Sequence, residues 1–503
     1  MRPAVSSKRR VVLGITLIII LTGIIYIPAM RAGFIWDDDT FLTKNELISA
    51  DNGLYRFWFT TEAPDYFPLT STTLWFEWRL WGMNATGYHV VNVLLHILSS
   101  ILLWRVLKRL KVPGAWLAGL IFAIHPVNVE SVAWITERKN VLPMVFYALS
   151  ILLYLKFESD GHRWLYGFSL IVFLLGLLSK TSVVMLPFVI LGCAWWQRGR
   201  IIGRDIVRTI PFFVMSIVLG LVTVWFQYNL AETEYIVRTD SFFSRLSGAG
   251  WCIWFYLYKA IIPIRLTFVY PRWEIDAFSI ISYMPGLLLV GLLVLFWWFR
   301  RSWARPLLFA LGYYIVTLLP VIGFLNIYFM KYSLVADHWQ YTSIIGPIAL
   351  LVGIGSKAYE HWHRRIKLLG ISAAVVLVGL LSWQTWTQAH IYQDLHTLWK
   401  DTLAKNPDCW MAHDNLGVIL GQQGNLEKAV YHLSEAVRLN PNNEKAHNNL
   451  GIALAMQGRY SEAIHHYREA LRIKPRYRIA RRNLDLLLHK MGMPSGFQTG
   501  QHQ

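Results

Sequence analysis

The feature that most restricts this chain is a series of apolar runs separated by short clusters of lysine and arginine. The first run, Val11–Met30, has 20 residues, and a helix needs about 20 residues to cross a bilayer. Charged residues make up only 16% of the 503-residue chain, against roughly 25% in soluble domains. Because basic clusters mark cytoplasmic loops, the pattern predicts an all-α, multi-pass membrane protein with its N-terminus in the cytoplasm.

The apolar runs number about 11 when each crossing is allowed roughly 20 residues. They are residues 11–30, 88–107, 113–125, 141–157, 164–178, 181–196, 209–227, 283–299, 306–323, 341–356 and 368–386. Gly250–Tyr270 is interrupted by Lys259, Pro263 and Arg265. The basic clusters on either side of it require an even number of crossings, so we expect it to be re-entrant or interfacial on the outer face.

The remaining composition excludes several classes of protein. The net charge of +18 does not indicate a nucleic-acid partner, because the basic residues fall between apolar runs as orientation signals do. Cys193, Cys252 and Cys409 are far apart in the sequence, so they support neither a zinc site nor a disulfide framework. The first run is longer than a signal-peptide core, and we expect it to be retained as an anchor.

The chain changes character after Trp386. Residues 410–443 and 444–477 repeat at a period of 34, and both carry Asn-Leu-Gly at the same place and a closing proline. That period and those small residues predict tetratricopeptide repeats, which stack into an α-solenoid. The predicted organisation is a membrane domain 1–390 with a long first outer loop 31–87, a repeat domain 391–491, and a disordered tail 492–503.

Ionisable residues at the predicted outer ends of the runs are candidates for function. Asp37, Asp38 and Asp39 directly follow the first run. A carboxylate there could accept a proton from a hydroxyl, bind a metal or be solvated. The other candidates on this side are His125, Glu130, Glu137, Arg138, Lys139, Lys180, Arg272, Lys331, Asp337 and His338. Each also has a structural interpretation, such as a helix cap for His125 or a snorkelling side chain for Lys180.

Several short segments occur in an order that resembles a known family. They are Trp36-Asp37-Asp38, Phe67-Pro68-Leu69-Thr70, Gly87–Asn92, Phe122–Ala133, Leu178-Ser179-Lys180 and Ala336–Tyr341. Together with the repeats, they resemble the transmembrane and tetratricopeptide-repeat-containing O-mannosyltransferases, which are GT-C glycosyltransferases. The chain departs from that family in having two repeats, Thr181 where an acidic residue is common, and His338 where an arginine is common.

The resemblance implies a GT-C-type helical bundle and a polyprenyl-phosphate-linked sugar as donor. The acceptor would be a hydroxyl, of protein Ser or Thr by the family's pattern. It would attack the anomeric carbon of the donor with inversion, as lipid phosphate leaves, on the outer face of the plasma (inner) membrane. The general base would be Asp37, with Asp38 orienting the acceptor or replacing Asp37. Donor-phosphate contacts would come from Arg138, Lys180, His338, Lys139 and Arg272. The pocket would be shaped by His125, Glu130 and Asp337.

The resemblance also implies that the repeats lie outside the cytoplasm and hold the protein or peptide acceptor. It implies no required cofactor, although a carboxylate pair could bind a divalent metal. Two other functions are compatible with the residues. One is a non-catalytic membrane scaffold that presents the repeats for protein assembly, and the other is a lipid or polysaccharide transporter. Polar residues concentrated at the outer ends of the runs weigh against transport.

Overall fold

The computed structural model describes residues 2–229 and 238–493. Within them, every regular element is a helix, so the all-α prediction is confirmed. The chain forms two compact units, one comprising Met1–Phe268 and Arg272–Asp394, the other Val269–Pro271 and Leu395–Gln503. The apolar runs fall in the first unit and the repeats in the second.

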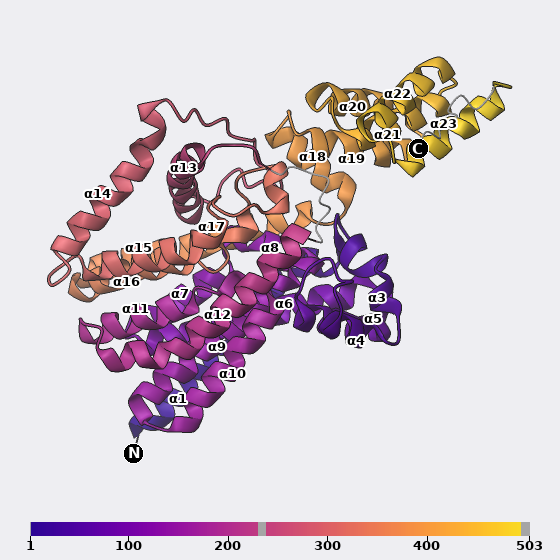
Figure 1. The fold of residues 1–503 in the computed structure, drawn as a ribbon. Coiled ribbons are helices and arrows are strands. Elements are labelled where there is room, and N and C mark those ends of the chain that lie inside the picture. Colours follow the sequence, from indigo (N-terminus) through magenta and orange to yellow (C-terminus); the bar gives the residue numbers. More distant parts are fainter. Residues whose placement is uncertain (1, 230–237, 494–503) are drawn as a thin grey trace. The chain divides into compact units, whose positions relative to one another are not determined.

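Each of the predicted apolar runs contains a helix (Figure 1). In the first unit these helices are α1 (Arg2–Ile25), α6 (Ala85–Arg109), α7 (Ala115–Ala123), α9 (Arg138–Asp160), α10 (Arg163–Ser179), α11 (Leu186–Arg198), α12 (Gly203–Asn229), α14 (Met284–Trp298), α15 (Arg305–Leu318), α16 (Ile345–His361) and α17 (Arg364–Ile391). In the bundle, α6 packs against both α7 and α9, and α9 packs against α10. These contacts place α6 and α9 at the centre of the bundle.

Length and composition allow fewer crossings than runs. Within residues 2–229 and 238–493, five stretches are long and apolar enough to span a membrane, namely Ala85–Arg109, Ile135–Asp160, Gly203–Tyr228, Ile280–Trp298 and Arg365–Ile391. A sixth is possible if Ala115–Ala123 and Pro126–Ala133, bent by 48°, form one span. These several apolar helices indicate a multi-pass membrane protein, but the count of about 11 is not confirmed.

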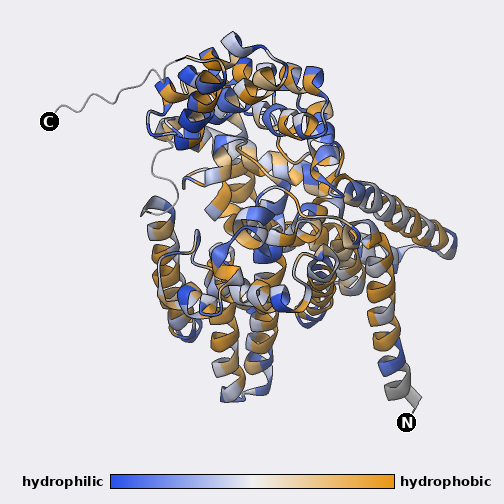
Figure 2. Cartoon of the chain, turned by 90° about the vertical axis from the view of Figure 1, so that its right-hand side faces the viewer, coloured by the Kyte–Doolittle hydropathy of each residue, from blue (hydrophilic) through white to orange (hydrophobic). Residues whose placement is uncertain are grey.

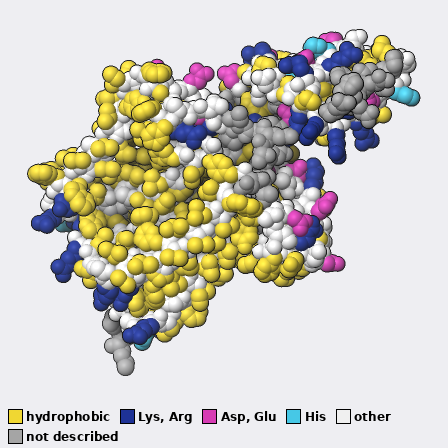
Figure 3. Space-filling view, in the orientation of Figure 1, with side chains coloured by type: hydrophobic (Ala, Val, Ile, Leu, Met, Phe, Trp, Pro, Cys, Tyr) yellow, Lys and Arg dark blue, Asp and Glu magenta, His cyan; other side chains and the backbone are white. Residues whose placement is uncertain are grey.

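The surface of this unit suits an apolar surrounding. Only 6% of the apolar window of α14, and the same share of that of α17, is buried. Figure 2 shows the mainly apolar colouring of the long helices. In Figure 3, apolar side chains cover most of the visible face, while Lys and Arg gather along its lower-left edge. Exposed apolar area of this extent is stable only against lipid or another apolar surface.

Two predicted boundaries differ in the structure. The first run is not one helix, because α1 ends at Ile25 and a short α2 (Ile27–Met30) begins with Pro28 near its start. Proline lacks the N–H group that a continuing helix needs. The predicted interruption at Lys259 is wrong in position, since α13 (Phe242–Ile261) runs through that residue and ends shortly before Pro263. Whether α13 is re-entrant stays a prediction.

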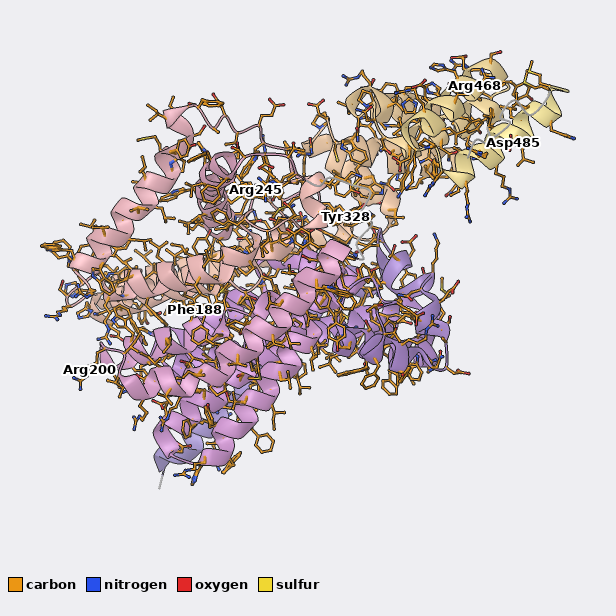
Figure 4. The ribbon with its side chains drawn as sticks, in the orientation of Figure 1. Phe188, Arg200, Arg245, Tyr328, Arg468 and Asp485 are labelled. Carbon is orange, nitrogen blue, oxygen red and sulfur yellow. The ribbon has the colours of Figure 1, made fainter. Side chains whose placement is uncertain are left out.

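The segment after α15 is tied back to α13. Arg245, labelled in Figure 4, lies near the start of α13 and donates to the carbonyl of Phe324 at 3.2 Å. The hydroxyl of Tyr328, also labelled there, lies 3.3 Å from that of Tyr332. These contacts fix the irregular stretch that leads to His338.

The first loop folds into a small helical lobe. Its elements are the π-helix η1 (Asp39–Thr43), α3 (Glu46–Ser49), α4 (Gly53–Phe59) and α5 (Pro68–Trp81). They share an apolar core that includes Leu42, Ile48, Phe57 and Leu74. The amphipathic stretches predicted in this loop therefore form helices that bury their apolar faces in the lobe.

The second unit is a stack of helix pairs. It contains α18 (Leu395–Lys405), α19 (Trp410–Gln422), α20 (Leu426–Leu439), α21 (Glu444–Met456), α22 (Tyr460–Ile473) and α23 (Arg478–Lys490). Gly417 lets α19 approach α20, because a Cβ atom there would lie 2.6 Å from Leu433 Cγ. The predicted repeats are thus formed as helix pairs. Most of the tail predicted to be disordered, residues 494–503, lies outside the described residues.

The repeats contain two equivalent histidine pairs. The Nδ1 atoms of His413 and His432 lie 3.0 Å apart, and those of His447 and His466 lie 3.1 Å apart. His447 Nε2 also lies 3.0 Å from the carbonyl oxygen of Pro441. Because a carbonyl only accepts, His447 carries its proton on Nε2 and accepts at Nδ1 from His466. The pair therefore fits two neutral rings.

Candidate active site

The backbone just before the first acidic residues is held in an unusual conformation. Trp36 has a φ of 39°, in the left-handed region that costs a bulky residue about 1–3 kcal/mol. Its ring packs against Trp134 and Phe268, each at a centroid distance of 5.3 Å. Phe329 and Tyr332 lie at 5.7 and 6.1 Å. This aromatic cluster stabilises the turn and fixes the direction of the residues that follow.

Asp38 turns inward and is fully buried. Its Oδ2 accepts from the backbone N–H of Ile35 at 2.8 Å, and its Oδ1 accepts from that of Thr136 at 3.0 Å. Burial, and then the nearby Asp37 carboxylate, raise the pKa of Asp38 to about 8. With both oxygens used by the backbone, this side chain joins the first loop to the segment before α9.

Asp37 points to the same segment but keeps part of its surface open. Its Oδ1 accepts from the Thr136 hydroxyl at 2.7 Å, and its Oδ2 lies 3.6 Å from Lys139 Nζ. Burial raises the pKa of the Asp37 carboxyl, while Lys139 opposes that shift. A carboxylate held in this way is oriented on one oxygen and charge-compensated on the other.

A chain of charges continues from Asp37 to Lys180. Lys139 Nζ lies 3.7 Å from Glu137 Oε1, and Lys180 Nζ lies 3.7 Å from Glu137 Oε2. Lys180 also donates to Asn140 Oδ1 at 2.8 Å. The predicted base and two of the predicted phosphate ligands are therefore parts of one charged cluster, linked by Glu137.

His338 joins the cluster from the short segment Asp337–Gln340, about 160 residues after Lys180 in the chain. Its Nδ1 lies 3.0 Å from Glu130 Oε1, and its backbone N–H donates to Glu130 Oε2 at 3.1 Å. The carboxylate accepts, so the Nδ1 atom carries the proton. The backbone carbonyl of His338 accepts from Asn140 Nδ2 at 3.1 Å. Glu130 thus fixes the ring of His338, and Asn140 contacts both His338 and Lys180.

Arg138, predicted to bind phosphate, is placed differently. Its side chain is fully buried, and its Nη2 donates to Glu77 Oε2 at 3.0 Å and to the Tyr88 carbonyl at 3.1 Å. Its Nε donates to Asn92 Oδ1. Because all three nitrogen atoms already have protein acceptors, the structure does not offer this guanidinium to a phosphate.

The remaining predicted residues have local roles. His125 caps the 3₁₀ segment that follows it, and its Nε2 lies 3.1 Å from the Ala260 carbonyl. Arg272 donates to the Lys331 carbonyl at 3.0 Å. Asp337 is buried at the start of the segment Asp337–Gln340. Their geometry fits the structural interpretations at least as well as the functional ones.

Sequence reasoning did not select Asp65, which lines a cavity beside the cluster. The cavity is small and partly open to the outside, and Lys139 and Thr136 also line it. A single acid in a loop, outside any repeated motif, is a weak signal in sequence. Glu137 stood among the candidates, but nothing in its spacing showed that it links two lysines.

The described residues contain no group of three or more His, Cys, Asp and Glu side chains that could hold a metal ion. The metal site considered for the acidic residues therefore has no assembled ligand set within residues 2–229 and 238–493. Its carboxylates are used by backbone N–H groups, a hydroxyl and a lysine.

Comparison with family models matches the two parts of the chain separately. Residues 64–228 match the model described as dolichyl-phosphate-mannose-protein mannosyltransferase. Residues 417–458 and 444–477 match tetratricopeptide-repeat models. The chain is a relative of the protein O-mannosyl-transferases. The resemblance inferred from the short segments and the repeats is thus confirmed.

The relatives named protein O-mannosyl-transferase come from several animals. One from Caenorhabditis elegans is 24% identical over 87% of this chain. One from Mus musculus is 33% identical over 26% of it, and one from Drosophila melanogaster 30% identical over 33%. The chain spans 64% of the length of the Caenorhabditis relative, and 17% and 20% of the other two.

Proposed function

We propose that this protein is a GT-C-type glycosyltransferase that moves mannose or another hexose from a polyprenyl-phosphate donor to a protein Ser or Thr hydroxyl. The observation that carries the proposal is the position of Asp37. Its carboxylate is held by Thr136 and lies against Lys139, and these two partners line a small cavity. Thr136, Lys139 and Lys180 all belong to the segment that matches the mannosyltransferase model.

The reaction needs a base and a stabilised leaving group. The acceptor hydroxyl oxygen attacks the anomeric carbon, its proton passes to Asp37, and the bond from that carbon to the lipid-phosphate oxygen breaks. Attack opposite the leaving phosphate inverts the anomeric centre. A positioned base contributes about 10²–10⁴-fold. Burial, which raises the pKa of Asp37, makes its carboxylate a better proton acceptor than an exposed one.

The leaving phosphate gains charge as the bond breaks, and cations must face it. Lys180 lies at the edge of the charged cluster, and 19% of its side chain is exposed. His338 is clamped by Glu130 through Nδ1, which leaves Nε2 to donate to an oxygen when the ring is protonated. We assign the phosphate to Lys180 and His338, with Lys139 compensating Asp37.

Orientation follows from charge. The Lys and Arg side chains at the lower-left edge in Figure 3 would face the cytoplasm under the positive-inside rule. The lobe α3–α5, which directly follows Asp37 and Asp38 in the chain, lies on the opposite side of the unit in Figure 1. This supports a reaction on the outer face of the plasma membrane. We further propose that the repeats bind the acceptor protein, in line with the general use of such solenoids.

The test uses the full chain in proteoliposomes, with radiolabelled polyprenyl-phosphate mannose and a Thr-containing peptide. We expect Asp37→Asn to lower transfer by at least about 100-fold, with normal expression and an unchanged elution profile. The matched control is Asp39→Asn, because 42% of the Asp39 side chain is exposed and its carboxylate contacts Lys44 Nζ at 2.8 Å and the Thr40 hydroxyl at 3.3 Å. Equal transfer by Asp37→Asn and wild type would refute the proposed base. A wild-type chain that transfers no sugar would favour the scaffold function.

A further inference from the structure

The first-loop lobe carries an apolar face on its outside as well as an apolar core. Five large apolar side chains on α4, on α5 and in the turn after α5 are between 54% and 73% exposed. They are Tyr55, Phe59, Phe76, Leu80 and Met83. Exposed apolar side chains that gather in one place mark a surface that meets a partner, so this face needs a partner.

The inward and outward sides of α5 follow from helix geometry. Leu74 and Glu77 are buried, while Phe76 and Leu80 are exposed. Because residues three or four apart share one face of a helix, the buried pair and the exposed pair form two separate stripes. The helix therefore uses one stripe to hold the lobe together and presents a second, apolar stripe to its surroundings.

The neighbouring helix α4 has the same arrangement. Phe57 is buried in the core of the lobe. Tyr55 and Phe59 lie four residues apart on the exposed side, with their ring centroids 5.4 Å apart. In Figure 3, apolar side chains gather along the lower margin of the lobe, where Figure 1 labels α4. The outward apolar face thus includes both helices.

The sequence order places this face beside the membrane. Helix α5 ends at Trp81, and α6, which is long and apolar enough to span a bilayer, begins at Ala85. Four peptide steps reach at most about 14 Å, so the last turn of α5 lies close to the end of a span. Leu94 and Leu98 continue the exposed apolar surface on α6. The face of the lobe therefore begins where the lipid-facing surface of the span ends.

Hydrogen bonds hold α5 along this side of the bundle. The Thr70 hydroxyl donates to the carbonyl oxygen of Ser179, the last residue of α10, at 2.8 Å. Near the other end of α5, Glu77 accepts from Arg138, the first residue of α9, at 3.0 Å. Both contacts join α5 to the ends of bundle helices, so the lobe cannot swing away from the membrane surface without breaking them.

The polar groups beside the apolar face point away from it. Arg79 directly precedes Leu80, but its guanidinium stacks over the Trp75 ring at 3.2 Å. It also donates to the carbonyl oxygens of Ile48 at 3.0 Å and Ala50 at 2.9 Å. An apolar stripe next to an arginine and to partly buried tryptophans is typical of helices that lie in the membrane interface. This chemistry favours lipid over a charged protein surface.

We propose that the first-loop lobe lies on the bilayer, with the outward face of α4 and α5 immersed among the lipids of the leaflet on that side. The partner is the lipid surface itself, and the inference holds whether or not the chain transfers a sugar. Glu77 on the inward side of α5 binds Arg138, which directly precedes Lys139. Immersion of α5 therefore also sets the depth of the charged cluster relative to the lipid headgroups.

Spin labels measure this immersion in the full chain, reconstituted into phosphatidylcholine vesicles. We expect nitroxides on Phe59→Cys and Leu80→Cys to lie about 5–10 Å below the headgroups, so that oxygen relaxes them more than a water-soluble nickel chelate does. Ser49→Cys is the water-exposed control on α3 of the same lobe, and Leu94→Cys is the lipid-exposed control. The native cysteines are buried and stay unlabelled.

Two results would overturn the proposal. Labels at positions 59 and 80 that respond to the nickel chelate as the Ser49→Cys label does would place the face in water. Labels shielded from both reagents would show that a protein surface, such as a second copy of the chain, covers the face instead of lipid.

A second experiment needs no substitution. The wild-type chain is reconstituted with a phosphatidylcholine that carries a photoactivatable diazirine in the upper part of one acyl chain, and its peptides are mapped by mass spectrometry after illumination. We expect lipid adducts on α4, on the last turn of α5 and on α6, but not on α3. Adducts on α6 together with unmodified α4 and α5 would refute the immersion of the lobe.

Discussion

Replacing Arg138 separates a structural role from the phosphate-binding role predicted for it. Its side chain is 0% exposed, and that of its partner Glu77 is 9% exposed. In Arg138→Met the Glu77 carboxylate stays buried without its cation, and the Tyr88 carbonyl and the Asn92 amide oxygen lose a donor. Breaking a buried ion pair in this way costs about 3–5 kcal/mol.

Glu77→Gln provides a graded comparison for this pair. It keeps the shape of the side chain and one acceptor oxygen, so it loses one of the two charge-assisted bonds to Arg138. Such a bond is worth about 1.5–3 kcal/mol. We therefore expect the stability order wild type, Glu77→Gln, Arg138→Met, from most to least stable.

The assay is the temperature at which the detergent-solubilised chain loses its monodisperse elution peak. At roughly 2 °C per kcal/mol, the sensitivity of a domain of about 250 residues, Arg138→Met should lower this midpoint by about 6–10 °C. Arg163→Met is the control, because Arg163 is exposed at the start of α10. An unchanged midpoint with a raised donor KM would show that Arg138 binds phosphate after all.

Three further predictions concern single contacts. Thr136→Val should lower kcat by about 10–100-fold through loss of the 2.7 Å hydrogen bond to Asp37, whereas Thr136→Ser should keep most of the wild-type kcat. Equal kcat values for the two variants would contradict this orienting role of Thr136. Gly417→Ala should destabilise the repeats by about 1–3 kcal/mol, because the new Cβ would meet Leu433. Faster hydrogen exchange in α19 would show this loss of stability, and slower exchange would contradict it. Burial lowers the pKa of His466 to about 4, so the repeats should lose stability as the pH falls from about 6.5 towards 4. Hydrogen exchange in α22, corrected for intrinsic rates, measures this loss. Exchange that does not change with pH would refute the effect.

The fold was predictable where one physical signal dominated. Apolar runs and a repeat period of 34 depend on local composition and spacing, so both located helices correctly. Two boundaries were harder to predict. The end of α1 at Ile25 depends on Pro28. The continuation of α13 through Lys259 depends on where that lysine finds its acceptors. Lys259 donates to the carbonyl of Ile264 at 2.7 Å, and this contact keeps a charged residue inside an apolar helix.

The site was less predictable, because the sequence shows which charges exist but not which ones pair. Arg138 and Lys139 are neighbours in sequence, yet the first points to Glu77 and the second to Asp37. One step along a helix turns a side chain by about 100°, which decides the partner. Asp65 has no pattern at all, and only the walls of the cavity single it out.

The partners of Trp36 have a consequence for biosynthesis. The ring of this residue emerges early, but Phe268 and Phe329 are made only after most of the bundle has been synthesised. Until they arrive, Trp134 is the early partner that packs against Trp36, and the strained backbone there lacks the support of the two later rings. We therefore expect Asp37 to reach its final position only after the late segments have been inserted and folded.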